Sequence, residues 1–198
     1  MANLNAPFGF SPIIYGTSGV NNQQQRVYYI PASDTSAYYI GDTVKTVVGS
    51  DANGTPAVAK CASGVAPRGV MSSILINNPN LPSIQGVNLD LTLTSIPASK
   101  SADYYILVND DPDQVYIIQG DSTTFVTTDL NKNATYTVAA PAQANQMSAT
   151  VLTGTTTSST AALKIVGIEP IPGNTLGQYV RFLVMFNNAE LLRPSVGV

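Results

Sequence analysis

The sequence predicts an all-β protein built as a jelly-roll-like sandwich or a barrel. Three observations support this fold class. Short runs rich in Val, Ile, Tyr and Thr recur throughout the 198 residues, turn-forming residues separate these runs, and no long window carries the apolar stripe of a helix. Many short strands joined by turns are typical of sandwiches and barrels, in which each strand buries at least one face.

The predicted strands lie between strong turn sequences. Residues 51–54, 110–113 and 172–174 combine Asp, Asn, Gly and Pro, which are the residues that tight turns favour. Residues 89–93 alternate Leu with polar residues and fit a further strand at a sheet edge, and one helical turn is expected near residues 128–131. The predicted strands are residues 26–30, 43–48, 57–61, 69–76, 104–109, 115–119, 135–139, 147–152, 163–168 and 179–186.

We expect a single β-domain, residues 26–190, flanked by two segments of different character. Residues 1–25 are rich in Pro, Gly, Asn and Gln, which indicates an extended N-terminal arm. Residues 191–198 form a C-terminal tail, because Pro194 ends strand pairing. Two alternatives stay open for both ends. They wrap around their own domain, or a neighbouring subunit captures them.

Charged residues are scarce in this chain. Asp, Glu, Lys and Arg make up 11% of the residues, against about 25% in an ordinary soluble protein. The nine Lys and Arg residues are spread from Arg26 to Arg193 with no two adjacent, and the net charge is -3, so we expect no binding of nucleic acid. A weakly charged surface protects poorly against association. We therefore expect a protein that works bound to other proteins.

The sequence carries no signal for a membrane or for secretion. The longest apolar run, residues 182–186, is far shorter than the roughly 20 residues of a membrane-spanning helix. Residues 1–25 contain no Lys or Arg, so we expect no signal peptide and expect synthesis in the cytoplasm. Cys61 is the single cysteine, which excludes an intrachain disulfide.

The residue types of common catalytic centres are missing. The chain has no histidine, which excludes imidazole base catalysis and imidazole ligands to zinc. Asp110, Asp111 and Asp113 fit a tight turn better than a calcium site, because the glycine and the terminal glutamate of an EF-hand loop are absent. We expect no catalytic, cofactor or metal site and no enzymatic activity.

Adjacent tyrosines suggest where an interface lies. They occur at residues 28–29, 38–39 and 104–105, and neighbours on a strand face opposite sides of the sheet. One ring of each pair therefore faces outward, either in ordinary cross-strand packing or in a protein interface. Together with the apolar residues of the two ends, the candidate interface residues are Pro7, Phe8, Phe10, Ile14, Tyr29, Tyr39, Leu191 and Leu192.

Four stretches together resemble one family of phage proteins. They are residues 5–12 (N-A-P-F-G-F-S-P), 26–34 (R-V-Y-Y-I-P-A-S-D), 105–119 around N-D-D-P-D, and 192–198 (L-R-P-S-V-G-V). Their order and spacing, over nearly the whole chain, are similar to those of capsid cement or decoration proteins of tailed phages. In that family basic residues often flank the proline after N-A-P-F-G, whereas Ser11, Ile13 and Ile14 stand here. Apolar docking of the arm is therefore favoured over electrostatic docking.

The resemblance implies a structural role. It implies a jelly-roll-like virion protein on the outer capsid surface, made in the host cytoplasm, that clamps neighbouring major capsid subunits against internal pressure. Its expected partners are the major capsid protein and other copies of itself, in a dimer or a trimer. The alternative from another class is a tail or fibre module that binds carbohydrate or another receptor. An enzyme is the third reading, and the missing histidine disfavours it.

Overall fold

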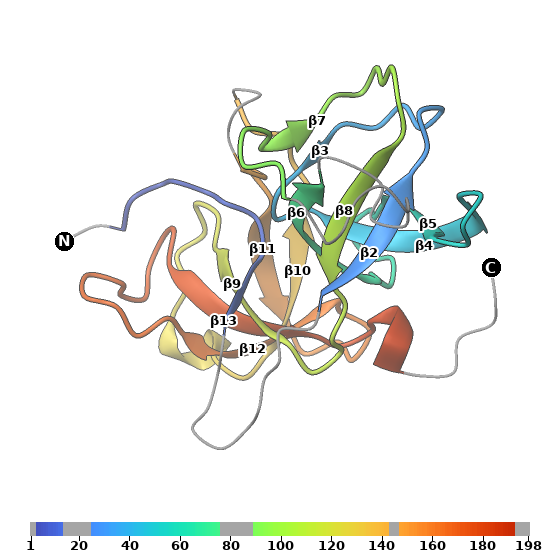
Figure 1. Ribbon diagram of the computed structural model, residues 1–198. Coiled ribbons are helices and arrows are strands. Elements are labelled where there is room, and N and C mark those ends of the chain that lie inside the picture. The colour runs from blue at the N-terminus through green and yellow to red at the C-terminus, as the bar shows by residue number, and fades with distance from the viewer. Residues whose placement is uncertain (1–2, 14–24, 76–88, 143–146, 193–198) are drawn as a thin grey trace.

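The computed structural model describes residues 3–13, 25–75, 89–142 and 147–192 (Figure 1). Within these ranges the secondary structure consists of strands and two short 3-10 helices, η1 (Thr127–Asp129) and η2 (Glu190–Leu192), without an α-helix. The prediction of an all-β fold is confirmed. The strands form a closed barrel beside a curled sheet, which is a sandwich-like arrangement. The finer jelly-roll assignment stays a prediction.

The first part of the chain forms the barrel. Its strands follow the closed order β2-β5-β4-β6-β8, and every neighbouring pair is antiparallel except β2 and β5. Alternate side chains of these strands fill the interior, among them Tyr28, Met71 and Ile106, each 1% exposed or less. The barrel strands are β2 (Gln25–Ile30), β4 (Thr43–Ser50), β5 (Pro56–Lys60), β6 (Gly69–Leu75) and β8 (Tyr104–Asn109). A small ribbon of β3 (Tyr38–Tyr39) and β7 (Ser95–Ile96) lies beside it.

The second part of the chain forms a sheet of six strands, in the order β1-β9-β13-β12-β10-β11. The sheet curls, because Gly120 at the end of β9 forms a parallel bridge with Leu152 of β11. The inside of this curl holds a second core, which includes Tyr116, Leu163 and Phe182. Its strands are β1 (Ser11–Ile13), β9 (Val115–Gln119), β10 (Asn133–Thr137), β11 (Val151–Thr156), β12 (Leu163–Ile168) and β13 (Arg181–Phe186).

The N-terminal segment joins the two cores. The Phe10 ring lies inside the curled sheet, with its centroid 5.2 Å from that of Tyr136 and 5.1 Å from that of Phe186. Its amide donates to the Gly41 carbonyl, between β3 and β4 of the barrel part, over 2.9 Å. Phe10 is 1% exposed, so its interpretation as an interface residue is wrong. The reason is that a large aromatic side chain gains most free energy where it is fully removed from water, and here its own core offers that place.

Most predicted strands are confirmed, with shifts at their ends. Residues 147–150 lie outside a strand, and β11 begins only at Val151, because Ser148 and Thr150 make side-chain hydrogen bonds instead of ladder pairs. Residues 89–93 contribute an isolated bridge at Leu89 and no strand. The short strands β1, β3 and β7 were not predicted. The helical turn expected near residues 128–131 is present as η1.

Candidate protein interface

The described part of the N-terminal arm packs on its own chain. The side chain of Gln119, buried in the sheet, accepts from the Ala6 amide over 3.0 Å and donates to the Leu4 carbonyl over 2.7 Å. The Asn3 side chain donates to the carbonyls of Thr175 and Gln178, both over 2.8 Å. These bonds, together with the pairing of β1 and β9, place residues 3–13 on the curled sheet of the same chain. For these residues the first of the two alternatives holds.

Both faces of the curled sheet, the outer as well as the inner, carry apolar side chains. Strand β9 is buried on both sides: Tyr116 and Ile118 face the inner core, whereas Val115 and Ile117 belong to a separate cluster with Leu183. We call this cluster the outer apolar face; it also includes the half-buried Phe8, Ile13, Val166 and Met185. An antiparallel sheet commonly has one face in the core and one polar face in water. Here the chain itself covers the centre of this face, since Val115, Ile117 and Leu183 are 6%, 6% and 3% exposed, and only the half-buried members reach the solvent.

Phe8 lies at the rim of this face beside an ion pair. The guanidinium carbon of Arg181 is 4.8 Å from the centroid of the Phe8 ring, and Arg181 Nε is 2.7 Å from Glu169 Oε2. A guanidinium over an aromatic face is held by the charge distribution of the ring. Because Glu169 neutralises the cation, the rim carries no net charge.

Next to Phe8 the surface is hollowed. The hollow has a volume of about 260 Å³ and lies between the N-terminal segment and the loop that precedes β13. Leu4, 78% exposed, and Ile171, 39% exposed, stand on its wall. Tyr179 lines it too and has φ 58°, a left-handed conformation that costs free energy for a bulky residue. We call this site the apolar hollow; its apolar lining comes from Leu4, Ala6, Phe8, Ile171, Pro172 and Tyr179.

The other predicted interface residues are spread over the molecule. Tyr29 faces outward and pairs across strands with Tyr105, with ring centroids 5.7 Å apart. Tyr39 is half-buried, with the Lys60 ammonium 5.3 Å from its ring centroid. Leu191 in η2 is 38% exposed. Thus Pro7 and Phe8 lie together, but the tyrosines and Leu191 belong to other elements. Ile14 and the side chain of Leu192 lie outside the described residues.

The tyrosine pairs alternate as predicted in the barrel. Tyr28 is 1% exposed in the core while its neighbour Tyr29 faces outward. Tyr105 also faces outward, yet it is only 9% exposed, because its hydroxyl donates to Asp51 over 2.9 Å and Tyr29 covers its ring. For this pair, cross-strand packing accounts for the outward ring.

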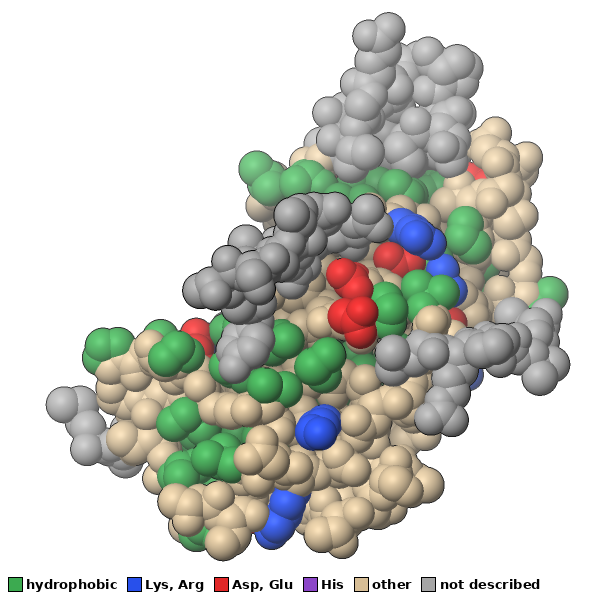
Figure 2. Space-filling view, turned by 90° about the horizontal axis from the view of Figure 1, so that it is seen from below, with side chains coloured by type: hydrophobic (Ala, Val, Ile, Leu, Met, Phe, Trp, Pro, Cys, Tyr) green, Lys and Arg blue, Asp and Glu red, His purple; other side chains and the backbone are tan. Residues whose placement is uncertain are grey.

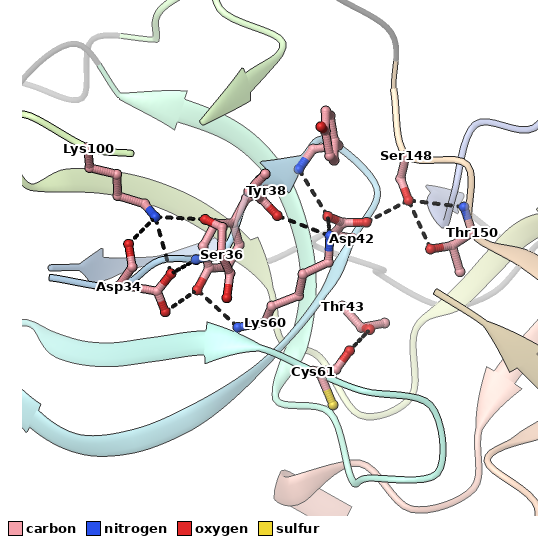
Figure 3. A network of polar contacts seen from close by, with 12 residues as sticks. Asp34, Ser36, Tyr38, Asp42, Thr43, Lys60, Cys61, Lys100, Ser148 and Thr150 are labelled. Atoms are coloured by element: carbon pink, nitrogen blue, oxygen red, sulfur yellow. Dashed lines mark hydrogen bonds and ion pairs between the residues drawn. The ribbon is translucent and has the colours of Figure 1, made fainter. Parts of the chain in front are cut away.

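A buried carboxylate joins the barrel to the sheet (Figure 3). Asp42 is fully buried; its Oδ2 lies 2.8 Å from Lys60 Nζ, and its Oδ1 accepts from the Ser148 hydroxyl over 2.6 Å. A buried charge is tolerated only where it is paired and hydrogen-bonded. Ser148 lies 106 residues away in the sequence. No sequence pattern indicates this contact, because it depends on how the sheet packs against the barrel.

The buried Lys100 side chain holds the loop before β3. The Lys100 ammonium donates to the Asp34 carbonyl over 2.6 Å, to the Ser36 carbonyl over 2.7 Å and to the Asp34 carboxylate over 3.1 Å (Figure 3). Burial opposes the charged form of Asp34, but the Ser36 amide and Lys100 outweigh it and lower the pKa of this carboxyl. Lys100 therefore has a structural role within the chain.

Asp110 differs from the turn residue that we predicted. It is 3% exposed and accepts from the Tyr28 hydroxyl over 2.7 Å, with Arg68 Nε at 3.5 Å. Burial and the bond to Asp110 raise the pKa of Tyr28 to about 12. Asp111 forms the predicted turn, since its carboxylate accepts from the Asp113 amide over 3.0 Å and its carbonyl from the Gln114 amide over 3.2 Å. The assignment of Asp110 to a simple turn is wrong, because its carboxylate binds groups inside the barrel.

Most of the described Lys and Arg side chains form ion pairs with carboxylates of the same chain. Among the described residues, six Lys and Arg side chains form ion pairs with carboxylates: Arg26, Lys60, Arg68, Lys100, Lys132 and Arg181. Figure 2 shows hydrophobic side chains gathered in several groups on one face of the molecule, with Lys and Arg side chains at a few separate places between them, in one place beside acidic side chains. These Lys and Arg side chains thus pair carboxylates within the chain.

Neither a metal centre nor a membrane span is found in the part of the chain that the structure describes. There, no three carboxylate or thiol side chains gather in a way that could hold a metal ion. Within the same ranges no helix has the length and apolar character to cross a membrane. Comparisons with protein-family models, curated proteins and solved structures found no match to this chain.

Proposed function

We propose that this chain is a structural protein of a tailed-phage head that binds the outer capsid surface and clamps neighbouring major capsid subunits. The observation that carries the proposal is the half-buried part of the outer apolar face, on a sheet whose other face is already filled by a core; this part consists of Phe8, Ile13, Val166 and Met185. The sequence resemblance to cement proteins supports the phage setting. The ion pairs of Lys60 and Lys100 with carboxylates of the same chain, and the missing histidine, support a binding role without a chemical step.

The clamp acts through binding free energy. A shell filled with DNA is under internal pressure, and a protein that bridges capsid subunits adds contacts that must break before the shell opens. Contacts that are weak alone become strong when one rigid body makes several on the same lattice, because the second contact forms at high effective concentration. The barrel and the curled sheet supply the rigid body. The half-buried residues of the outer apolar face, together with Pro7 beside Phe8, supply the docking surface.

The experiment is a capsid stability assay. Expanded capsids without the protein are saturated with the chain, and their disruption on heating is followed by light scattering. We expect disruption at a higher temperature with the wild-type chain. A matched variant, Met185→Asp, adds a charge to the half-buried rim of the outer apolar face, whereas Val48→Asp adds one to a side chain that is 79% exposed on β4.

We expect Met185→Asp to abolish the gain in capsid stability and Val48→Asp to retain it, provided that circular dichroism shows both folded. Equal disruption temperatures with and without saturating wild-type protein would contradict the proposal. The number of copies per virion is a second measurement. Hundreds of copies support a shell protein, and six or twelve contradict it.

A receptor-binding module is the second candidate. The outward-facing, half-buried ring of Tyr29, which lies over Tyr105, favours it, because an aromatic face suits the C–H face of a sugar. Binding of the purified chain to immobilised glycans, lost in Tyr29→Ala, would support this candidate over the capsid role.

A further inference from the structure

The hairpin of β4 and β5 (Figure 1) ends in a turn that holds the single Asn-Gly sequence of the chain, Asn53-Gly54. Residues 52–54 are exposed at the tip of this hairpin. The backbone amide of Asn53 donates to Asp51 Oδ1 over 3.0 Å, but within the described part of the chain no group forms a hydrogen bond with the Asn53 side chain. This side chain is therefore open to water and free to turn toward its own backbone.

An asparagine in this position can react with the backbone that follows it. The backbone nitrogen of Gly54 forms a bond to the side-chain carbonyl carbon of Asn53, the bond from that carbon to Nδ2 breaks, and ammonia leaves with the proton of the Gly54 amide. The cyclic imide then takes up one water, which breaks one of its two C–N bonds and gives aspartate or isoaspartate. Glycine permits the attack because it has no side chain beside the nitrogen, and no atom lies within 4 Å of where a Cβ on Gly54 would stand.

The other asparagines are less suited to this reaction. Each of them precedes a residue that carries a side chain. The Asn174 side chain is also fixed, since it donates to the carbonyls of Glu169 and Arg181 and accepts from the Arg181 amide, all over 2.9 Å. Asn131 is exposed and has φ 62°, but Lys132 follows it. Asn53 alone combines an exposed, unbound side chain with a following glycine within the described ranges.

Asp51 holds the Asn53-Gly54 turn closed. Its Oδ1 accepts from the Thr55 amide over 2.7 Å, and its Oδ2 accepts from the Thr55 hydroxyl over 3.1 Å and from the Tyr105 hydroxyl over 2.9 Å. Its carbonyl accepts from the Gly54 amide over 3.2 Å, at the long end of the usual range. Because the attacking nitrogen belongs to this last bond, the turn must open at Gly54 before the ring can form.

We propose that Asn53 is the residue at which this chain first loses a side-chain amide, and that Asp51 sets the rate by holding the turn closed. The reaction needs only the chain and water. It therefore goes beyond the proposed function and does not depend on a capsid.

The reaction changes the tip of the hairpin. The imide removes the amide proton of Gly54 and with it the hydrogen bond to the Asp51 carbonyl. Isoaspartate adds one carbon to the main chain before Gly54, so Thr55 cannot keep both of its bonds to the Asp51 carboxylate. Either product also places a second carboxylate near Asp51 and adds a negative charge to a chain whose net charge is -3. Like charges this close repel each other, which loosens the turn further.

The first part of the test follows the folded chain during storage in warm, mildly alkaline buffer, where the Gly54 amide loses its proton more readily. Peptide mapping by mass spectrometry locates each lost amide, and an isoaspartyl methyltransferase labels isoaspartate. We expect the rate at Asn53 to exceed that at every other asparagine by at least about tenfold. Asn53→Gln is the matched control and should stay unmodified at this position, because its longer side chain would have to close a larger ring. Faster loss at another asparagine, or no loss at Asn53, would overturn the proposal.

The second part tests the role of Asp51. Asp51→Ala removes the acceptor of the Thr55 and Asn53 amides, and we expect it to speed the reaction at Asn53 at least about threefold. Tyr105→Phe removes a single bond to the same carboxylate, so its rate should lie between those of the wild type and Asp51→Ala. Asp121→Ala is the control: it removes a carboxylate that accepts from the Thr123 amide in a different turn, and the rate at Asn53 should stay that of the wild type.

Circular dichroism confirms that each variant is folded before the rates are compared. An unchanged rate at Asn53 in both Asp51→Ala and Tyr105→Phe would overturn the role of Asp51. An equal acceleration by Asp121→Ala would overturn it too, because the effect would then come from a general loosening of the fold.

Discussion

Ser148 donates its hydroxyl to Asp42 over 2.6 Å, and this bond links the segment before β11 to the start of β4. Both side chains are fully buried. The carboxylate also binds Lys60, and the Ser148 amide donates to the Ile40 carbonyl over 2.9 Å. Two parts of the molecule with separate hydrophobic cores thus share one polar junction. Such a junction makes the packing of barrel against sheet specific, because only one arrangement satisfies the buried charge.

We predict that Ser148→Ala lowers the free energy of unfolding by about 1–3 kcal/mol, because it leaves a lone pair of a buried carboxylate without its donor. Urea denaturation followed by circular dichroism measures the loss. Ser158→Ala is the control, since Ser158 is exposed and its hydroxyl bonds lie at the surface. A loss of equal size in both variants would contradict the role of the junction.

The Phe10 ring should contribute much more to stability than the Phe8 ring. Phe10→Ala removes a side chain that is 1% exposed and leaves a cavity among Tyr116, Tyr136 and Phe186, so we expect a loss of about 3–5 kcal/mol. Phe8 is half-buried at the rim of the outer apolar face, and its loss should be clearly smaller. Guanidinium denaturation of the two variants tests the ranking. A more destabilising Phe8→Ala would contradict it.

The difference between these two phenylalanines shows where sequence reasoning stops. Phe8 and Phe10 stand in the same Pro- and Gly-rich segment, and their residue type predicts contact with an apolar surface without saying whose surface it is. The structure places Phe10 in its own core and Phe8 at a rim. A short strand such as β1 has too few residues to show a period. Its pairing with β9 depends on a partner more than a hundred residues away.

Short sequence patterns predicted those elements that depend on interactions between residues close in the sequence. The apolar run Val115-Tyr116-Ile117-Ile118, which follows a turn sequence, predicted β9, and the Asp111 turn follows from side-chain bonds within three residues. The polar site around Asp42 could not be predicted in this way. Its members Lys60 and Ser148 come from different parts of the chain, and a buried Asp carries no mark in the sequence that separates it from an exposed one.

Gly41 should be intolerant of a side chain. Its φ is 93°, and a Cβ placed on it would lie 2.6 Å from the Phe8 carbonyl oxygen, so Gly41→Ala must displace the N-terminal segment. Gly173→Ala is a matched control: φ is 86°, but no atom lies near the added Cβ. The control should lose about 1–2 kcal/mol from backbone strain alone, and Gly41→Ala clearly more. Equal melting temperatures of the two variants would show that the close approach is unimportant.

Cys61 should be unreactive in the folded chain. It is fully buried, and burial raises the pKa of its thiol to about 11, so almost no thiolate is present near pH 8. We expect labelling by a thiol reagent only as fast as the protein opens, whereas an exposed cysteine in Ser158→Cys should react at once. Quantitative labelling of Cys61 within seconds under native conditions would contradict the burial.

Acid should weaken the fold partly through Asp34. The Ser36 amide and Lys100 outweigh the effect of burial and hold the folded-state pKa of Asp34 below its ordinary value. The unfolded chain therefore binds this proton first as the pH falls. The stabilisation is complete above the unfolded pKa of about 3.9 and is lost as the pH falls through the lower folded pKa.

In Asp34→Asn this contribution is absent at every pH. We expect the difference in the free energy of unfolding between wild type and Asp34→Asn to be constant near neutral pH and to shrink below about pH 4. Urea denaturation at several pH values measures it, and a difference that stays unchanged down to the lowest pH would show that the Lys100 site does not favour the carboxylate.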